Sequence, residues 1–128
     1  MILDVLFIER GDVMDSKIVL SLPRLNGIVP TFESTMIKMT EEVGEVAQLV
    51  GKHRCMSKED THELLSSKEF VKDLAGELID VAQSAVSFMF VLSDAYGLDI
   101  DKALSEHNEK LIRKGYLKGD DKIGLNSK

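Results

Sequence analysis

The sequence predicts an all-α protein, and three observations lead to this fold class. The 128-residue chain contains two prolines, no tryptophan and only 5% aromatic residues. Two long stretches carry apolar residues at alternating spacings of three and four, which is the period of an amphipathic helix. Gly97 closes the second stretch, and glycine is favoured just beyond a helix C-terminus. We therefore expect a helical bundle of two long antiparallel helices plus shorter helices.

Residues 1–30 are expected to form an N-terminal extension. Met1 to Ile8 is largely apolar, but it lacks the basic start of a secretory signal, and charged residues soon interrupt it. Glu9-Arg10-Gly11 is what a purine-rich ribosome-binding sequence encodes in frame, so Met14 is an alternative natural start. Residues 1–13 would then be a start-site artefact. One short helix is predicted over Lys17–Leu22.

The first long helix is expected from about Phe32 to His53. Thr31 is suited to be its N-cap, and Gly51 is expected to terminate it. Its apolar row consists of Met36, Met39, Val43, Val46 and Val50.

Three further segments follow along the chain. Ser57 with Asp60 predicts a short polar helix that runs toward Ser66. The second long helix is expected from about Lys68 to Tyr96, with an apolar row at Leu74, Leu78, Val81, Ala85, Phe88 and Leu92. Asp99 is expected to cap a third helix that carries Ile100, Ala103, Leu104, His107 and Leu111. Residues 117–128 are expected to form a flexible tail.

Charge and composition limit the classes of function. Sixteen Lys and Arg against 22 Asp and Glu give a net charge of −6, so a nucleic-acid polymer is not expected as partner. No stretch approaches the ~18 consecutive apolar residues of a membrane span, so no membrane is expected. Cys55 is the only cysteine, which favours a reducing, cytoplasmic location. Two long helices cannot enclose a deep core, so we expect a homodimer or homotetramer to complete a four-helix core.

Carboxylates lie beside the apolar rows of both long helices. Glu42 and Glu45 are one turn apart with Glu41 adjacent, and Glu77 and Asp80 repeat the arrangement. If the apolar rows pack together, these carboxylates meet and require a cation. Oxygen-only ligands favour hard ions such as Mg²⁺ or Mn²⁺. One such row alone is more often a solvated helix face, so the metal hypothesis depends on both rows.

Three segments carry a resemblance to a known family. They are Lys38–Ala47 (KMTEEVGEVA), Glu77–Val81 (ELIDV) and, more weakly, Asn108–Lys114 (NEKLIRK). In the last segment, Leu111 stands in place of an aromatic residue and Lys114 in place of an arginine. Together they resemble the MazG family of all-α nucleoside triphosphate pyrophosphohydrolases. The resemblance runs from about Phe32 to Tyr116, which implies a catalytic domain over residues 31–116.

The resemblance implies a Mg²⁺-dependent enzyme, with Mn²⁺ as a substitute, that converts an NTP or dNTP and water to NMP and pyrophosphate in nucleotide pool control or house-cleaning. It implies metal ligands at Glu42, Glu45, Glu77 and Asp80. Glu41 would position or deprotonate the attacking water. The residues implied to contact the substrate phosphates are Lys38, Asn108, Lys110, Arg113 and Lys114.

Two alternative functions stay open at this point. One is a phosphoribosyl-ATP pyrophosphohydrolase, which has a similar acidic helical site. The other is a non-catalytic helical regulatory or interaction protein, which would bind no metal. Within the second long helix, Phe88-Met89-Phe90 is expected in the core or at a dimer interface rather than around a base. Ser84 and Ser87 are expected either to support the acidic row or to be ordinary helix-packing serines.

Overall fold

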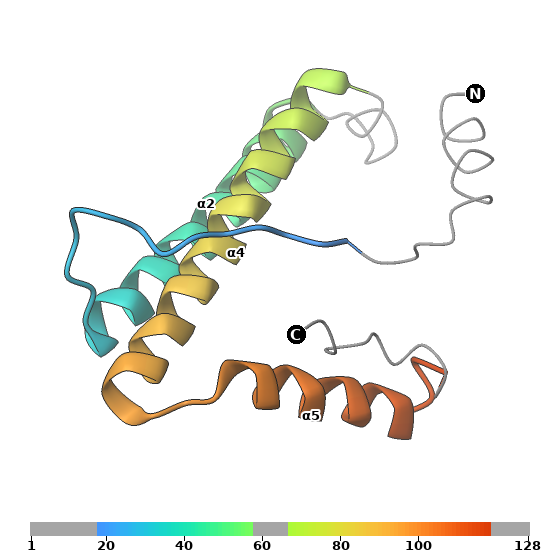
Figure 1. Ribbon diagram of the computed structural model, residues 1–128. Helices are drawn as coiled ribbons and strands as arrows, with labels where there is room; N and C mark the ends of the chain where they lie inside the picture. The colour runs from blue at the N-terminus through green and yellow to red at the C-terminus, as the bar shows by residue number, and fades with distance from the viewer. Residues whose placement is uncertain (1–17, 58–66, 119–128) are drawn as a thin grey trace.

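The computed structural model describes residues 18–57 and 67–118, and within these ranges it is all-α, with no strand. The helices are α2 (Phe32–Ser57), α4 (Lys68–Tyr96) and α5 (Ile100–Arg113). Figure 1 shows α2 and α4 side by side and antiparallel, with α5 leaving the end of α4 and pointing away from the pair. The predicted all-α class is confirmed.

Side-chain caps set the helix boundaries. At the start of α2, the Ser34 N–H donates to Thr31 Oγ1 at 3.1 Å, and the Thr31 N–H donates to Ser34 Oγ at 2.8 Å. This reciprocal pair satisfies two main-chain donors, as in a capping box. Ser67 caps α4 and Asp99 caps α5. Gly97 follows α4 with φ 72°, a left-handed conformation in which glycine has no Cβ penalty.

Two predicted features near the helix ends are wrong. Residues 18–22 form no helix, because Pro23 disfavours helical backbone in the residue before it and a single turn is too short to offset nucleation. Gly51 does not end α2, which continues through it to Ser57. The predicted helix toward Ser66, residues 1–13 and the tail beyond residue 118 lie outside the described residues.

Buried side chains follow a seven-residue repeat along the two long helices. On α2 these are Thr35 and Glu42, and on α4 they are Phe70, Ser84 and Val91. A seven-residue spacing keeps one face of a helix toward its partner. Glu77, which is half-buried, occupies the remaining place in the α4 repeat. The seam between α2 and α4 therefore has polar groups at its centre.

Aromatic contacts close the seam at both ends. Phe32 meets Phe88 edge-on, with 5.3 Å between ring centroids, at the end where α2 begins. His53 meets Phe70 at 4.8 Å at the end where α4 begins. Edge-to-face pairs of this kind add about 0.5–1.5 kcal/mol each beyond the area they bury. They fix the spacing of the two helices on either side of the central polar groups.

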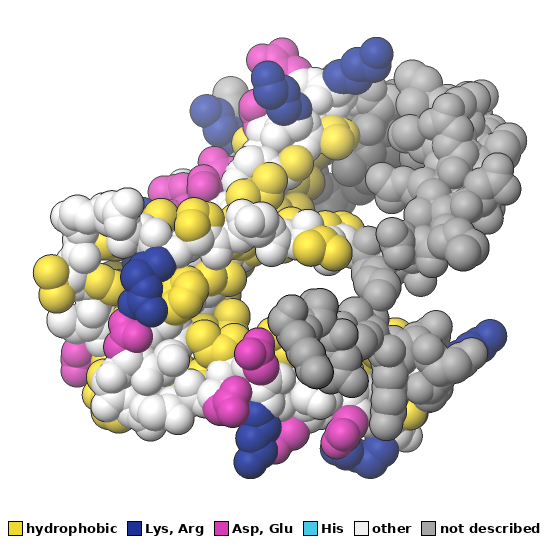
Figure 2. Space-filling model, viewed as in Figure 1, with side chains coloured by type: hydrophobic (Ala, Val, Ile, Leu, Met, Phe, Trp, Pro, Cys, Tyr) yellow, Lys and Arg dark blue, Asp and Glu magenta, His cyan; other side chains and the backbone are white. Residues whose placement is uncertain are grey.

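The predicted apolar rows coincide with this seam only in part: Phe88 packs there, whereas other members of the rows are exposed. Met36 is 48% exposed, and Val43 and Leu78 are each 52% exposed, while the acidic Glu42 is buried. Phe70 and Val91 are the only hydrophobic side chains classed as buried among the described residues. Figure 2 shows hydrophobic side chains exposed across this face of the molecule. A single chain thus leaves much of its apolar surface in water.

α4 is long and apolar enough, by length and composition alone, to cross a membrane. Its most apolar 18-residue window has a mean hydropathy of 1.4, and 11% of that window is buried. Core helices of soluble proteins can pass the same test, so this is a weak indication on its own. The expectation of no membrane partner stays a prediction.

Candidate functional site

Three carboxylates meet at the centre of the seam. Oxygen atoms of Glu42, Glu45 and Glu77 all lie within 4.8 Å of one another. Glu42 is 7% exposed, Glu77 is half-buried and Glu45 is exposed, so the cluster extends from the seam to its surface. The structure thus brings together three of the four ligands that the family resemblance implies.

The cluster carries more negative charge than its surroundings balance. Repulsion by Glu42 raises the pKa of Glu45 above its ordinary value, and repulsion by Glu77, desolvation and a hydrogen bond with Glu77 raise it further. Glu77 Oε2 is buried and has no hydrogen-bond partner. Such an orphaned oxygen costs free energy unless something binds it. A hard cation ligated by carboxylate oxygens would satisfy it, so the three residues fit the predicted metal.

Lys38 forms an ion pair with one member of this cluster. Its Nζ lies 2.8 Å from Glu42 Oε1 and 3.7 Å from Glu41 Oε2. The hydrogen bond to Glu42 is the main cause of the raised pKa of Lys38. The Glu41 side chain, which is expected to act on water, is 58% exposed at the edge of the cluster. Lys38, which is expected to contact phosphate, is here bonded to a carboxylate instead.

Asp80, the fourth implied ligand, stands apart from the three-carboxylate group. It lines an adjoining cavity of about 500 Å³, together with Lys38 and Glu42. Ser84 and Ser87 also line this cavity. Ser84 Oγ donates to the Val81 carbonyl at 2.8 Å, whereas Ser87 Oγ is buried without a partner. The cavity therefore holds carboxylates at one part of its lining and an unsatisfied hydroxyl at another.

The implied phosphate contacts on α5 lie away from the carboxylates. Lys110, Arg113 and Lys114 are exposed, and Asn108 is half-buried. α5 makes almost no contact with α2 or α4, and none of these four residues lines either cavity described here. Within one chain, the structure does not bring them to the acidic cluster.

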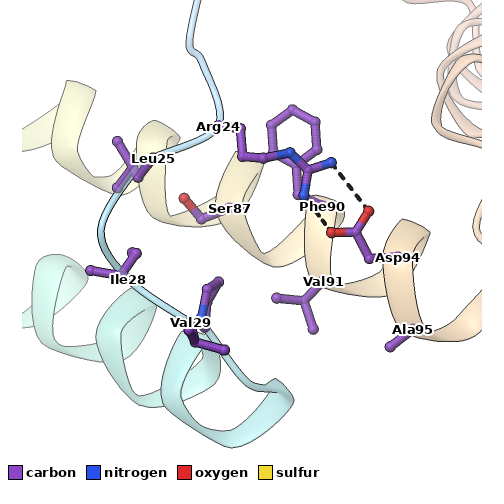
Figure 3. Close-up of a pocket in the computed structure, with 10 residues that line it drawn as sticks. Arg24, Leu25, Ile28, Val29, Ser87, Phe90, Val91, Asp94 and Ala95 are labelled. Atoms are coloured by element: carbon purple, nitrogen blue, oxygen red, sulfur yellow. Dashed lines mark hydrogen bonds and ion pairs between the residues drawn. The ribbon is translucent and has the colours of Figure 1, made fainter.

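Arg24 is a site residue that the sequence did not reveal. It forms a two-pronged ion pair with Asp94 on α4, and its second bond, from Nη2 to Oδ1, measures 3.1 Å. Its guanidinium carbon also lies 4.4 Å from the centroid of the Phe90 ring (Figure 3). The partners are 70 positions apart, so no local spacing could have indicated the contact. Beside it lies a second cavity of about 270 Å³.

Comparison with known proteins adds one finding. The family model described as the MazG nucleotide pyrophosphohydrolase domain matches residues 30–115, well over half of the 128-residue chain. No curated protein and no solved structure gave a significant match.

Proposed function

Because the chain belongs to the MazG nucleotide pyrophosphohydrolase family, we propose that it hydrolyses a nucleoside or deoxynucleoside triphosphate to the monophosphate and pyrophosphate, with Mg²⁺ as cofactor. One observation carries the proposal: the oxygens of Glu42, Glu45 and Glu77 converge within 4.8 Å, from two different helices. Such a cluster would repel a triphosphate, so the two can associate only through a cation. Mn²⁺ is the expected substitute, because it also prefers oxygen ligands.

The proposed metal ligands are Glu42, Glu45, Glu77 and Asp80. The first three already lie together, and the orphaned Glu77 Oε2 supports the assignment. Asp80 lies one turn from Glu77 on the same helix and shares the cavity lining with Glu42. Held by these residues, Mg²⁺ would neutralise negative charge on the triphosphate and would make water more acidic.

The chain's own groups supply the remaining chemistry. Glu41 accepts a proton from the attacking water, whose oxygen bonds to phosphorus as the bond to the bridging oxygen of the anhydride breaks and pyrophosphate leaves. The exposed position of Glu41 beside the cluster supports this role. If the Glu42 carboxylate held a cation, the Lys38 ammonium would be released from its ion pair and could bind phosphate. This exchange reconciles its observed ion pair with its proposed substrate contact.

A homo-oligomer is the second part of the proposal. The exposed apolar side chains of α2 and α4 and the almost contact-free α5 support it, because a second copy could cover them. Asn108, Lys110, Arg113 and Lys114 would then contact phosphate only after α5 packs against other helices. Homodimer and homotetramer are both compatible with this surface.

The test is pyrophosphate release from each NTP, each dNTP and phosphoribosyl-ATP, with and without Mg²⁺. Glu45→Gln should lower the rate at least about 100-fold, since even indirect partners of metal ligands are worth up to that factor. Glu33→Gln is the matched control, because Glu33 is an exposed acid in the first turn of the same helix. It should leave the rate unchanged.

Each alternative predicts a different result of this assay. Pyrophosphate release from phosphoribosyl-ATP alone would favour a phosphoribosyl-ATP pyrophosphohydrolase. No release from any nucleotide, together with no binding of Mg²⁺ by wild-type protein, would favour a non-catalytic interaction protein and overturn the proposed function.

A further inference from the structure

Residues 18–31 form a strap that crosses α4, and most of it precedes the matched family domain, which starts at residue 30. Three contacts hold the strap on that helix. Arg24 pairs with Asp94 and lies over Phe90, and Gln83 Nε2 donates to the Pro23 carbonyl at 3.0 Å. The Arg24 guanidinium lowers the pKa of Asp94, so the pair stays ionised in neutral solution. The strap is thus attached to the helix that carries Glu77 and Asp80.

The strap supplies an apolar wall to the cavity beside the carboxylates. Leu25, Ile28, Val29 and Pro30 line both the 500 Å³ cavity and its 270 Å³ neighbour. In Figure 3, Ser87 lies on α4 opposite Leu25 and Ile28. Its buried, unpartnered hydroxyl is a polar group in the same lining as these apolar strap residues. Ligand sites commonly combine an apolar lining with a few polar groups and occupy about 300–1,000 Å³.

The two ends of this space differ in chemistry. Glu42, Asp80 and Lys38 line one part, which suits the metal and phosphates of a nucleotide. The strap residues line another part, which suits a flat ring with apolar faces. A triphosphate linked to a nucleoside has these two chemistries in the same molecule. Continuity of the cavity with the carboxylates therefore favours the nucleoside of the substrate as its occupant.

We propose that the strap binds the nucleoside end of the substrate, with Leu25 and Ile28 as specificity-determining residues and Arg24 as a positioning residue. The inference rests on the proposed function and deepens it. Ser87 Oγ hydrogen-bonds a polar edge of the nucleoside. Arg24 acts only through Asp94 and Phe90, by holding the strap against α4.

The test measures kcat and KM of the full chain for all NTPs and dNTPs. Leu25→Ala and Ile28→Ala should each raise KM about tenfold, as expected for lost contacts in an apolar pocket. They should also reduce the differences in kcat/KM between nucleotides with different bases. They should change kcat less than KM. The inhibition constant of pyrophosphate, which has no nucleoside, should be unchanged. The inhibition constant of the NMP product of the preferred nucleotide should rise. Val19→Ala is the matched control, since Val19 lies on the strap, is 87% exposed and lines neither cavity.

A charge exchange tests the positioning role of Arg24. Arg24→Asp should raise KM in the same way, and the double variant Arg24→Asp, Asp94→Arg should restore it. A merely structural role would lower stability without a selective change in KM.

The outcomes separate the two proposals. If the wild type releases pyrophosphate but Leu25→Ala and Ile28→Ala leave KM and base preference unchanged, the nucleoside lies elsewhere and only this inference is overturned. The same holds if these variants alter the oligomeric state but not KM, because the strap would then bind a second copy. If the wild type acts on no nucleotide, the proposed function fails first.

Discussion

At the scale of single residues, Glu42 determines the electrostatics of the site. The residue is 7% exposed, and its carboxylate accepts a hydrogen bond from the Lys38 ammonium at 2.8 Å and repels Glu45, which lies less than one helical turn away. One lysine cannot neutralise three converging carboxylates, so the folded chain retains unfavourable charge. In the proposed function, this cost to the stability of the metal-free state is offset when a cation binds.

The raised pKa of Glu45 predicts how metal-free stability varies with pH. The folded state retains a proton that the unfolded chain releases at the ordinary glutamate pKa of about 4.3. Stability should thus fall as pH rises from that value through the raised pKa of Glu45. Thermal unfolding in EDTA between pH 4 and 8 should show this decline, and Glu45→Gln should reduce it.

Added Mg²⁺ should raise the Tm of the wild type at neutral pH, because a ligand of the folded state stabilises it. It should not raise the Tm of Glu45→Gln to the same extent. A Tm of the wild type that does not respond to Mg²⁺ would contradict the ligand assignment.

The acidic residues were the most predictable part of the site. Helical periodicity placed Glu42, Glu45 and Glu77 beside the contact between two helices, where the structure has them. Periodicity could not separate Asp80 from that group, because it fixes the face of a helix but not the reach of each side chain. Arg24 was unpredictable for another reason, since its partner Asp94 is distant in sequence and only the tertiary fold brings them together.

At the scale of elements, three of the helix caps were predictable, whereas the Gly51 terminator and part of the packing faces were predicted wrongly. Thr31, Gly97 and Asp99 were identified from the sequence because capping chemistry is local. The apolar rows, in contrast, suggested a pairing face through Val43 and Leu78, both of which are half-exposed. The actual seam holds Glu42 and Glu77, and in the proposed function a cation would stabilise these acidic groups at positions that hydrophobicity assigns to the core.

Two substitutions on α4 distinguish these faces. Phe70 is 5% exposed on the seam, so Phe70→Ala should lower the free energy of unfolding by about 3–5 kcal/mol. Leu78 is 52% exposed, so Leu78→Ala should cost less than about 1 kcal/mol in the isolated chain. Urea unfolding at low protein concentration measures both. Equal losses in the free energy of unfolding would mean that Leu78 is as buried as Phe70 and that the seam lies on a different face of α4.

At the scale of the whole molecule, the described part of the chain is incomplete as a globular core. Phe70 and Val91 are its only buried hydrophobic residues, and large apolar side chains are exposed on the strap and on all three helices. α5 has an apolar row but no buried residue. The small core could be predicted from the length of the sequence, because two long helices bury too little apolar surface against each other. The length could not indicate how copies would assemble, since that depends on shapes that form only after folding.

The proposed oligomer predicts a mass in solution that is a multiple of the 14.2 kDa chain. Leu104 lies on the apolar row of α5 and is 46% exposed, so Leu104→Glu should shift the protein toward the monomer. Size-exclusion chromatography with light scattering measures this shift. Glu106→Lys, an exposed charge change on the same helix, is the control and should leave the mass unchanged. A wild-type protein that stays monomeric at high concentration would contradict the proposed assembly.

The position of the strap has an evolutionary consequence. The carboxylates lie within the family domain, whereas Leu25 and Ile28 precede residue 30, where that domain begins. In the proposed arrangement, the carboxylates and the two apolar residues that select the base are encoded by separate stretches of the gene. Mutations in the codons upstream of the domain could then change the preferred nucleotide without altering the carboxylates.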